Sequence, residues 1–310
     1  MHVIRLYPVA PYDFHLSAII FSGGDPQIRT YENRIFWQVL DIRGTAVLAE
    51  VFSKGTADTP ELYLTIRPDD ALSGNGKTAA VDLISSMFNI NEDLTPFYRA
   101  MEKDNMMASH VSHLRGVKTP TTPTVFEALV DSVIEQQISL RAAQSIEKRL
   151  IRAVGSQLAL EDMVYYGYPT SRTLAETPDP TFRACGLTCR KGEFIRDISR
   201  QILFGVLDPE NFRVYTDTET IISELMKIRG IGRWTAELTI LRGLHRPDAF
   251  PADDIGVRRF IARFYLNGKK ISSVEARSFA ERWGAWKGFA AYYLEIADLL
   301  GICPLSSLNQ

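Results

Sequence analysis

The sequence predicts an α+β fold: a small antiparallel α/β N-terminal domain, residues 1–95, followed by a larger all-α domain, residues 96–310. Runs rich in β-branched and aromatic residues gather in the first part of the chain. From about Asn91 onward, apolar residues recur at helical spacing instead. A chain of 310 residues is also long enough to bury more than one hydrophobic core.

The N-terminal domain is expected to contain an antiparallel hairpin. Residues 35–42 and 45–52 have the composition of strands, and Arg43-Gly44 between them is typical of a short turn. Residues 62–66 predict a third strand. Two segments of this domain are expected to be helical, residues 13–21 and 77–88.

The all-α domain is predicted from its helix starts. Thr124-Val125-Phe126-Glu127 predicts a capping box. In such a box the threonine hydroxyl accepts a hydrogen bond from the glutamate amide, and the glutamate side chain accepts one from the threonine amide. Thr216-Asp217-Thr218-Glu219 repeats this pattern. The two prolines of residues 118–123 predict a loop before the first capped helix. The chain is expected to stay helical from there, with helices over residues 139–154, 193–203, 255–265 and 274–300, the last broken near Gly284-Ala285.

The composition is that of an ordinary globular protein, with 45% hydrophobic and 23% charged residues. A net charge of −2 argues against a histone-like protein but leaves nucleic-acid binding through a local patch open. Three cysteines are too few for a disulfide framework. The chain lacks both a long apolar run and a signal-peptide pattern. We therefore expect a soluble, cytoplasmic protein without a membrane partner.

The charge is distributed unevenly along the chain. Residues 1–115 carry 10 basic and 14 acidic side chains, whereas residues 116–310 carry 25 and 23. The window from 227 to 287 alone has 13 basic and 6 acidic residues, a net charge of +7. This window is where an anionic partner would bind, although a solvated basic surface with no partner is the commoner explanation of such a charge.

Residues 225–237 contain the most informative pattern. Gly230 and Gly232 interrupt a helical pattern that resumes at once, which predicts a helix, a tight hairpin and a second helix. Free amides at the start of the second helix would suit a phosphate, and a side chain at either glycine would block its approach. An ordinary packing corner between two helices remains the alternative.

An acidic pair, Asp253 and Asp254, stands at the start of another predicted helix. The helix dipole favours an ionised carboxylate there, although a plain N-cap is the commonest use of aspartate at such a position. Asp254 follows Gly232 by 22 residues, which is one helix and one loop later.

These patterns together resemble the helix-hairpin-helix DNA glycosylases, and more narrowly the AlkA-type 3-methyladenine DNA glycosylases (glycosylase II). The resemblance rests first on Gly-Ile-Gly-Arg-Trp-Thr-Ala-Glu at residues 230–237, followed by Pro251-x-x-Asp254. It extends over most of the chain, to residues 11–14, 134–139, 280–283 and 286–290. It implies an AlkA-type N-terminal domain and a glycosylase domain with its hairpin at 225–243 and its catalytic loop at 250–259.

The resemblance implies a monofunctional DNA glycosylase of base excision repair. Such an enzyme flips an alkylated base, such as 3-methyladenine or 7-methylguanine, out of double-stranded DNA and hydrolyses its N-glycosidic bond, leaving an abasic site. Asp254 is expected to be the catalytic residue because Ile255-Gly256-Val257-Arg258 follows it, and Asp253 is expected to be a cap or a supporting residue. Trp234 occupies the place where bifunctional relatives carry lysine, so no imine and no strand cleavage are expected.

The resemblance also implies the residues of the base pocket and of the DNA contacts. Trp234 is expected to stack on the flipped base, with core packing of its ring as the alternative. Leu238, also expected in the pocket, and Glu295 stand where bacterial relatives have aromatic residues. Phe289, Tyr292 and Tyr293 are therefore expected to supply aromatic surface. The expected DNA-binding residues are Gln137 as the wedge, Gln136 beside it, the amides of Gly230 and Gly232, and Arg233, Thr235, Arg258 and Lys287.

No cofactor is expected, apart from a structural monovalent cation at the hairpin. Cys185, Cys189 and Cys303 are too few and too dispersed for an iron–sulfur cluster or a structural zinc. The protein is expected to act as a monomer on nucleoid DNA. Two alternatives remain open: a glycosylase for hypoxanthine, 1-methyladenine or 8-oxoguanine, and a DNA-damage-binding protein without catalysis.

Overall fold

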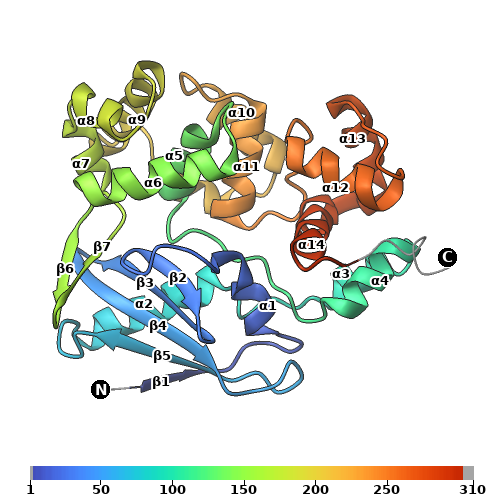
Figure 1. Ribbon diagram of the computed structural model, residues 1–310, viewed down its shortest axis with the longest axis horizontal. Coiled ribbons are helices and arrows are strands. Elements are labelled where there is room, and N and C mark those ends of the chain that lie inside the picture. The colour runs from blue at the N-terminus through green and yellow to red at the C-terminus, as the bar shows by residue number, and fades with distance from the viewer. Residues whose placement is uncertain (1–2, 303–310) are drawn as a thin grey trace.

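The computed structural model describes residues 3–302 and has the predicted α+β architecture, with a sheet below and a helical domain above it in Figure 1. The sheet is antiparallel, with five strands in the order β1-β5-β4-β3-β2. Its hairpin joins β3 to β4 through the predicted turn at Arg43-Gly44, with Ile42 opposite Thr45. The strands are β1 (Val3–Leu6), β2 (Arg29–Glu32), β3 (Ile35–Ile42), β4 (Thr45–Ser53) and β5 (Leu62–Arg67).

The helices of the N-terminal domain pack against this sheet. Their apolar residues join those of the strands in one hydrophobic core, in which Phe14, Phe36 and Phe88 form edge-to-face pairs. The helices are α1 (Phe14–Ala18), η1 (Ile19–Phe21) and α2 (Gly74–Met87).

The helical domain contains two further hydrophobic cores. The first is built on α5 to α11, and the second on α3, α4 and α12 to α14. The helices are α3 (Thr95–Met101), α4 (Asn105–His113), α5 (Val125–Glu135), α6 (Leu140–Val154), α7 (Ser171–Glu176), α8 (Asp179–Ala184), α9 (Cys189–Leu203), η2 (Pro209–Val214), α10 (Thr218–Met226), α11 (Arg233–Leu244), α12 (Ile255–Tyr265), α13 (Ser273–Ala280), η3 (Glu281–Trp286) and α14 (Lys287–Leu299). The predicted break is present at Gly284, where φ is 54°.

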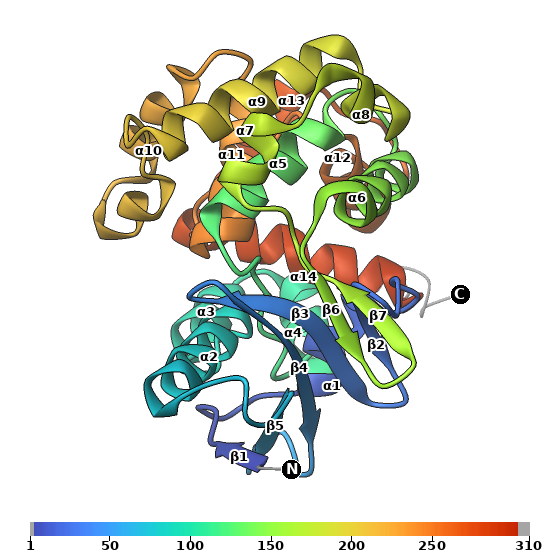
Figure 2. The same cartoon turned by 90° about the vertical axis from the view of Figure 1, so that its left-hand side faces the viewer.

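A hairpin of two short strands contradicts the prediction that the chain stays helical. The strands β6 (Gln157–Leu160) and β7 (Met163–Tyr166) leave the helical domain and lie beside the N-terminal sheet (Figure 2). The Tyr166 amide donates to the Gln27 carbonyl at 2.7 Å, and Arg152 forms an ion pair with Asp25. The hairpin therefore joins the two domains, a tertiary role that local helical periodicity does not reveal.

The helix caps differ from the predicted capping boxes. The Thr124 hydroxyl accepts the Glu127 amide at 3.0 Å as expected, but the Glu127 side chain is buried and does not return to the cap. The second cap is Asp217 rather than Thr216. A reciprocal capping box joins Ser272 and Glu275 instead. Within residues 3–302, no helix is both long enough and apolar enough to span a membrane.

Candidate active site and DNA-binding surface

Asp254 lies where the two cores of the helical domain meet, and its carboxylate accepts three hydrogen bonds. It is the N-cap of α12, so its Oδ1 accepts the amides of Gly256 at 2.7 Å and Val257 at 3.1 Å. Its Oδ2 accepts the indole N–H of Trp234, from α11, at 3.2 Å. All three groups are N–H donors, so both oxygens of the Asp254 side chain act as acceptors here. The cap and the candidate catalytic group are therefore one residue.

Asp253 does not have the predicted role of a cap. Its side chain is exposed, whereas Asp254 alone caps α12. Asp253 instead lines a surface hollow of about 380 Å³ together with Arg277 and residues of α13.

Trp234 lies outside both hydrophobic cores of the helical domain, contrary to the alternative that its ring packs in a core. It is the second residue of α11, it is only partly buried, and it belongs to neither core of the helical domain. The hydrogen bond to Asp254 orients its ring across the seam between α11 and α12. The structure therefore places an aromatic face and a carboxylate side by side.

Phe289 contradicts its assignment to the base pocket. Its side chain is 1% exposed and packs against His245, Trp286 and Phe97, so it is a core residue. Leu238 is also almost covered by protein. Tyr292 is similarly buried, but its hydroxyl has no hydrogen-bond partner. Burial raises the pKa of Tyr292 well above its ordinary value, so the hydroxyl keeps its proton.

The two hairpin glycines differ in what a side chain at each position would meet. Gly230 has a φ of +90°, and a Cβ there would lie 2.3 Å from a ring carbon of Phe194. Its absent side chain therefore serves the packing of α9 and not the approach of DNA, contrary to the sequence argument. Gly232 is the N-cap of α11, and a Cβ there would meet no atom within 4 Å.

The start of α11 has the properties of an anion-binding site. No side chain caps its first amides, and the N–H groups of a first helical turn have no partner within the helix. The open space at Gly232 leaves these amides accessible. A phosphate oxygen would complete their hydrogen bonds and would also interact favourably with the helix dipole.

The loop that carries the predicted wedge, Gln137, is held against this hairpin by hydrogen bonds of the preceding Gln136. Gln137 is exposed and has a φ of 57°, a left-handed conformation. The preceding Gln136 donates its side-chain amide to the Gly230 carbonyl at 2.9 Å and to the Thr235 hydroxyl at 3.1 Å. Lys191 donates to the Ile134 carbonyl at 2.7 Å and to the Gln136 carbonyl at 2.6 Å.

The sequence patterns did not indicate the role of Lys191 in holding this loop. It is 9% exposed, and burial lowers the pKa of its ammonium group. Its ammonium group, carried by α9, donates to carbonyls at the C-terminal end of α5. Lys191 and Ile134 are 57 residues apart along the chain. Only the fold reveals such a contact.

Besides Gln136, four predicted DNA-binding side chains are engaged within the protein. Thr235 is 3% exposed, so its hydroxyl supports Gln136 and does not face DNA as expected. Arg233 is paired with Glu219 and Glu237, and Lys287 with Glu281. Arg258 donates to the Ile271 carbonyl at 3.5 Å, and its Nε is buried without a partner.

The basic window is largely neutralised by ion pairs. Its cations bind carboxylates that mostly lie elsewhere in the sequence, which a local charge count cannot detect. These pairs are Lys227 with Glu224, Arg229 with Glu193 and Asp197, Arg242 with Glu135, and Arg259 and Arg263 with Asp298.

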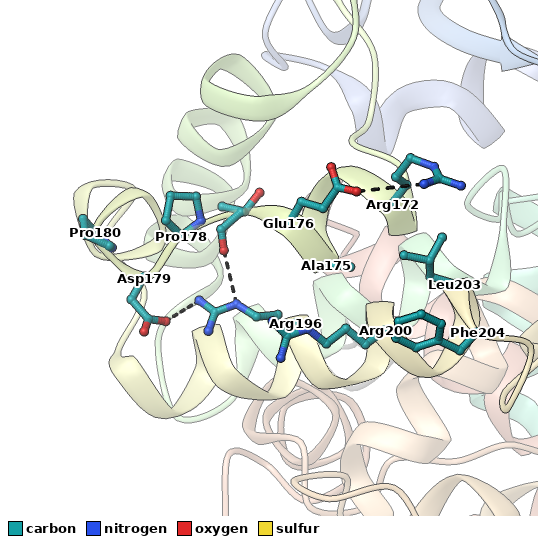
Figure 3. Close-up of a pocket in the computed structure, with 11 residues that line it drawn as sticks. Arg172, Ala175, Glu176, Pro178, Asp179, Pro180, Arg196, Arg200, Leu203 and Phe204 are labelled. Atoms are coloured by element: carbon teal, nitrogen blue, oxygen red, sulfur yellow. Dashed lines mark hydrogen bonds and ion pairs between the residues drawn. The ribbon is translucent and has the colours of Figure 1, made fainter.

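A larger hollow, of about 820 Å³, lies between α7 and α9 and contains none of the predicted site residues (Figure 3). Two of its three arginines are already paired, Arg172 with Glu176 and Arg196 with Asp179. The volume of a hollow therefore does not identify the site in this molecule. Within residues 3–302, no group of three or more histidine, cysteine or acidic side chains is arranged to hold a metal ion. Cys303 lies outside the described residues.

Comparisons with known proteins identify the family and the fold of the chain. Residues 130–285 match the family described as HhH-GPD superfamily base excision DNA repair protein. A DNA-3-methyladenine glycosylase of Bacillus subtilis is 31% identical over 216 residues, covering 69% of this chain and 70% of that protein. A putative DNA-3-methyladenine glycosylase of the same organism is 28% identical and covers 81% and 83%. The solved 3-methyladenine DNA glycosylase of Archaeoglobus fulgidus has the same fold, with a TM-score of 0.84 at 24% identity, covering 96% of this chain and 98% of that one. The chain belongs to the HhH-GPD superfamily of base excision DNA repair proteins.

Proposed function

We propose that this protein is a monofunctional DNA glycosylase that releases alkylated bases such as 3-methyladenine and 7-methylguanine and leaves an abasic site. The observation that carries this proposal is the hydrogen bond of 3.2 Å that joins Trp234 to Asp254 across the seam between α11 and α12. Family membership and relatives named as DNA-3-methyladenine glycosylases confirm the predicted class, a hydrolase of N-glycosidic bonds.

Asp254 would stabilise the positive charge that develops on the sugar as the glycosidic bond breaks. Its Oδ1 is occupied by two amides, while its Oδ2 receives only the Trp234 N–H and keeps a lone pair for the reaction. The same oxygen can orient a water molecule toward C1′ and accept its proton. Holding the carboxylate at three points fixes it before the substrate arrives.

Trp234 would bind the flipped base through its ring face. Alkylation at N3 or N7 makes a purine cationic, and the indole face attracts cations more strongly than other aromatic rings do. Indole has no amine that could form an imine with the sugar, which supports hydrolysis without strand cleavage. Because a cationic base leaves readily, one carboxylate and one aromatic face are enough to catalyse its release.

Double-stranded DNA is the partner, held through the uncapped amides at the start of α11. Backbone amides contact phosphate without reading sequence, as a repair enzyme requires. Gln137, at the exposed tip of a braced loop, would fill the gap that the flipped base leaves. A monovalent cation at the hairpin remains a prediction. The Gly230 carbonyl, a suitable oxygen ligand for such a cation, accepts a hydrogen bond from the Gln136 side chain. The monomeric state also remains a prediction.

The test is the release of free bases from DNA treated with a methylating agent, identified by chromatography. We expect 3-methyladenine and 7-methylguanine in the soluble fraction, and neither from untreated DNA. Parallel duplexes containing hypoxanthine, 1-methyladenine or 8-oxoguanine test the alternative lesions. Binding to methylated DNA without release of any base would contradict the proposal and favour a non-catalytic damage-binding protein.

A further inference from the structure

Arg190 is an exposed cation beside the hairpin that has no role in the proposed mechanism. It is the second residue of α9 and directly precedes Lys191, which donates to the Gln136 carbonyl at 2.6 Å. Its guanidinium carbon lies 5.4 Å from the centre of the Phe194 ring. The same ring fills the space that a side chain at Gly230 would need. These contacts place Arg190 beside both the hairpin and the residue that holds the wedge loop.

The charge of Arg190 is not neutralised by the protein. Within residues 3–302, its side chain forms no ion pair and no hydrogen bond, and its contact is with the Phe194 ring. The other arginines of this region differ. Arg229 lies over the same ring, at 5.5 Å, but is paired with Glu193 and Asp197. Arg233, at the start of α11, is also paired with two carboxylates.

The Phe194 ring prepares this guanidinium group for an anion. A cation over an aromatic ring is attracted by the ring, which restricts its motion and uses none of its N–H donors. The five donors of an arginine form a rigid fork that matches two oxygens of a phosphate. Arg190 therefore presents a positioned, uncompensated charge with its whole set of donors free.

We propose that Arg190 binds a phosphate of the DNA backbone, as a second anchor beside the amides at the start of α11. This inference rests on the proposed function and adds a residue that binds its substrate. Two observations favour DNA as the partner: the free positive charge, and its continuity through Phe194 with the hairpin at Gly230. Like the amides, a phosphate contact of this kind reads no base sequence.

The position of Arg190 changes where the charge for DNA binding comes from. Arg190 lies outside the basic window of residues 227–287, whose cations are largely neutralised by ion pairs. The hairpin supplies backbone amides, and α9 supplies the free cation next to them. A charge count along the sequence does not detect this division, because it depends on which cations the fold leaves unpaired.

The test measures the affinity for an undamaged fluorescent duplex by anisotropy at several salt concentrations. Each phosphate neutralised by a cation adds about 0.9 to the slope of log affinity against log salt. We expect Arg190→Gln to lower the slope by about 0.9 and the affinity about eightfold at 0.1 M salt, with a smaller difference at higher salt. Arg190→Lys keeps the charge and should keep most of the slope.

Arg200→Gln is the matched control. Arg200 lies on the same helix, about 15 Å further along it, is exposed, and forms no ion pair within residues 3–302. The substitution removes the same charge, so it reports the effect of net charge alone, and the slope should equal that of the wild type. Arg190→Gln should melt at the wild-type temperature, because an exposed side chain without hydrogen bonds contributes little to stability.

The possible results separate the inference from the proposed function. A wild-type slope in Arg190→Gln would overturn the inference, as would equal decreases in Arg190→Gln and Arg200→Gln. If the slope changes as expected but the wild type releases no base from methylated DNA, the phosphate contact is supported and the proposed function is contradicted. A wild type that does not bind duplex DNA would overturn both.

Discussion

Asp254 has two roles, and two substitutions separate them. Asp254→Asn keeps an oxygen that accepts the amides of Gly256 and Val257 but removes the charge. Asp254→Ala removes both. Asparagine and aspartate are equally good N-caps, whereas alanine at an N-cap costs about 1 kcal/mol. We therefore expect the asparagine variant to melt close to the wild type and the alanine variant about 2–4 °C lower.

The catalytic loss should be similar in both variants and much larger than the loss of stability. A carboxylate about 4 Å from a developing positive charge contributes about 4 kcal/mol at an effective dielectric constant near 20. Asp254 is partly exposed, and solvent weakens this attraction. We expect a rate loss of about 100- to 1,000-fold, equivalent to roughly 2.7–4 kcal/mol.

The assay is single-turnover release of 7-methylguanine from a duplex, with thermal melting of the same preparations. An asparagine variant that melts normally and retains activity within threefold of the wild type would refute the catalytic assignment. An alanine variant that is inactive and an asparagine variant that is active would show that the cap alone matters.

Three further predictions follow from the contacts around this site. Gly230→Ala should destabilise the fold by about 1–3 kcal/mol because φ is +90° and the methyl group would strike Phe194. Gly232→Ala should melt at the wild-type temperature but bind DNA more weakly, as measured by fluorescence anisotropy. Lys191→Met should cost about 1–3 kcal/mol by leaving the buried Ile134 carbonyl and the partly buried Gln136 carbonyl without this donor, and should reduce base flipping reported by a fluorescent base analogue. Burial raises the pKa of Glu127 from 4.5 to about 8, so the folded chain holds a proton that the unfolded chain loses, and the free energy of unfolding should decline across that range. Glu127→Gln should flatten this decline in melts recorded at several pH values, and an unchanged slope would assign it to other groups.

The sequence predicted those features that depend on local patterns. The β3–β4 hairpin follows from two alternating runs around Arg43-Gly44, and the break in the C-terminal helices follows from Gly284. The hairpin before α11 and the family also follow from short-range spacing, because two glycines one residue apart allow backbone conformations of a tight turn that other residues rarely adopt.

Features that depend on contacts across the fold were not predicted. The β6–β7 strands are stabilised by the N-terminal sheet, Phe289 by the core around α14, and the Gln136 loop by Lys191 on another helix. Most ion pairs of the basic window also depend on contacts across the fold, since most of their acidic partners lie far away in the sequence. Periodicity and net charge describe what a segment can bury or bind, whereas its partners depend on the fold.

The product of the reaction on a duplex with a single 7-methylguanine tests the central claim most directly. We expect free 7-methylguanine in equal amount to abasic sites, with the strand intact until alkali is added and no complex trapped by borohydride, because Trp234 provides no amine. Strand cleavage without alkali, a trapped covalent complex, or an intact 7-methylguanine duplex after prolonged incubation would contradict the account.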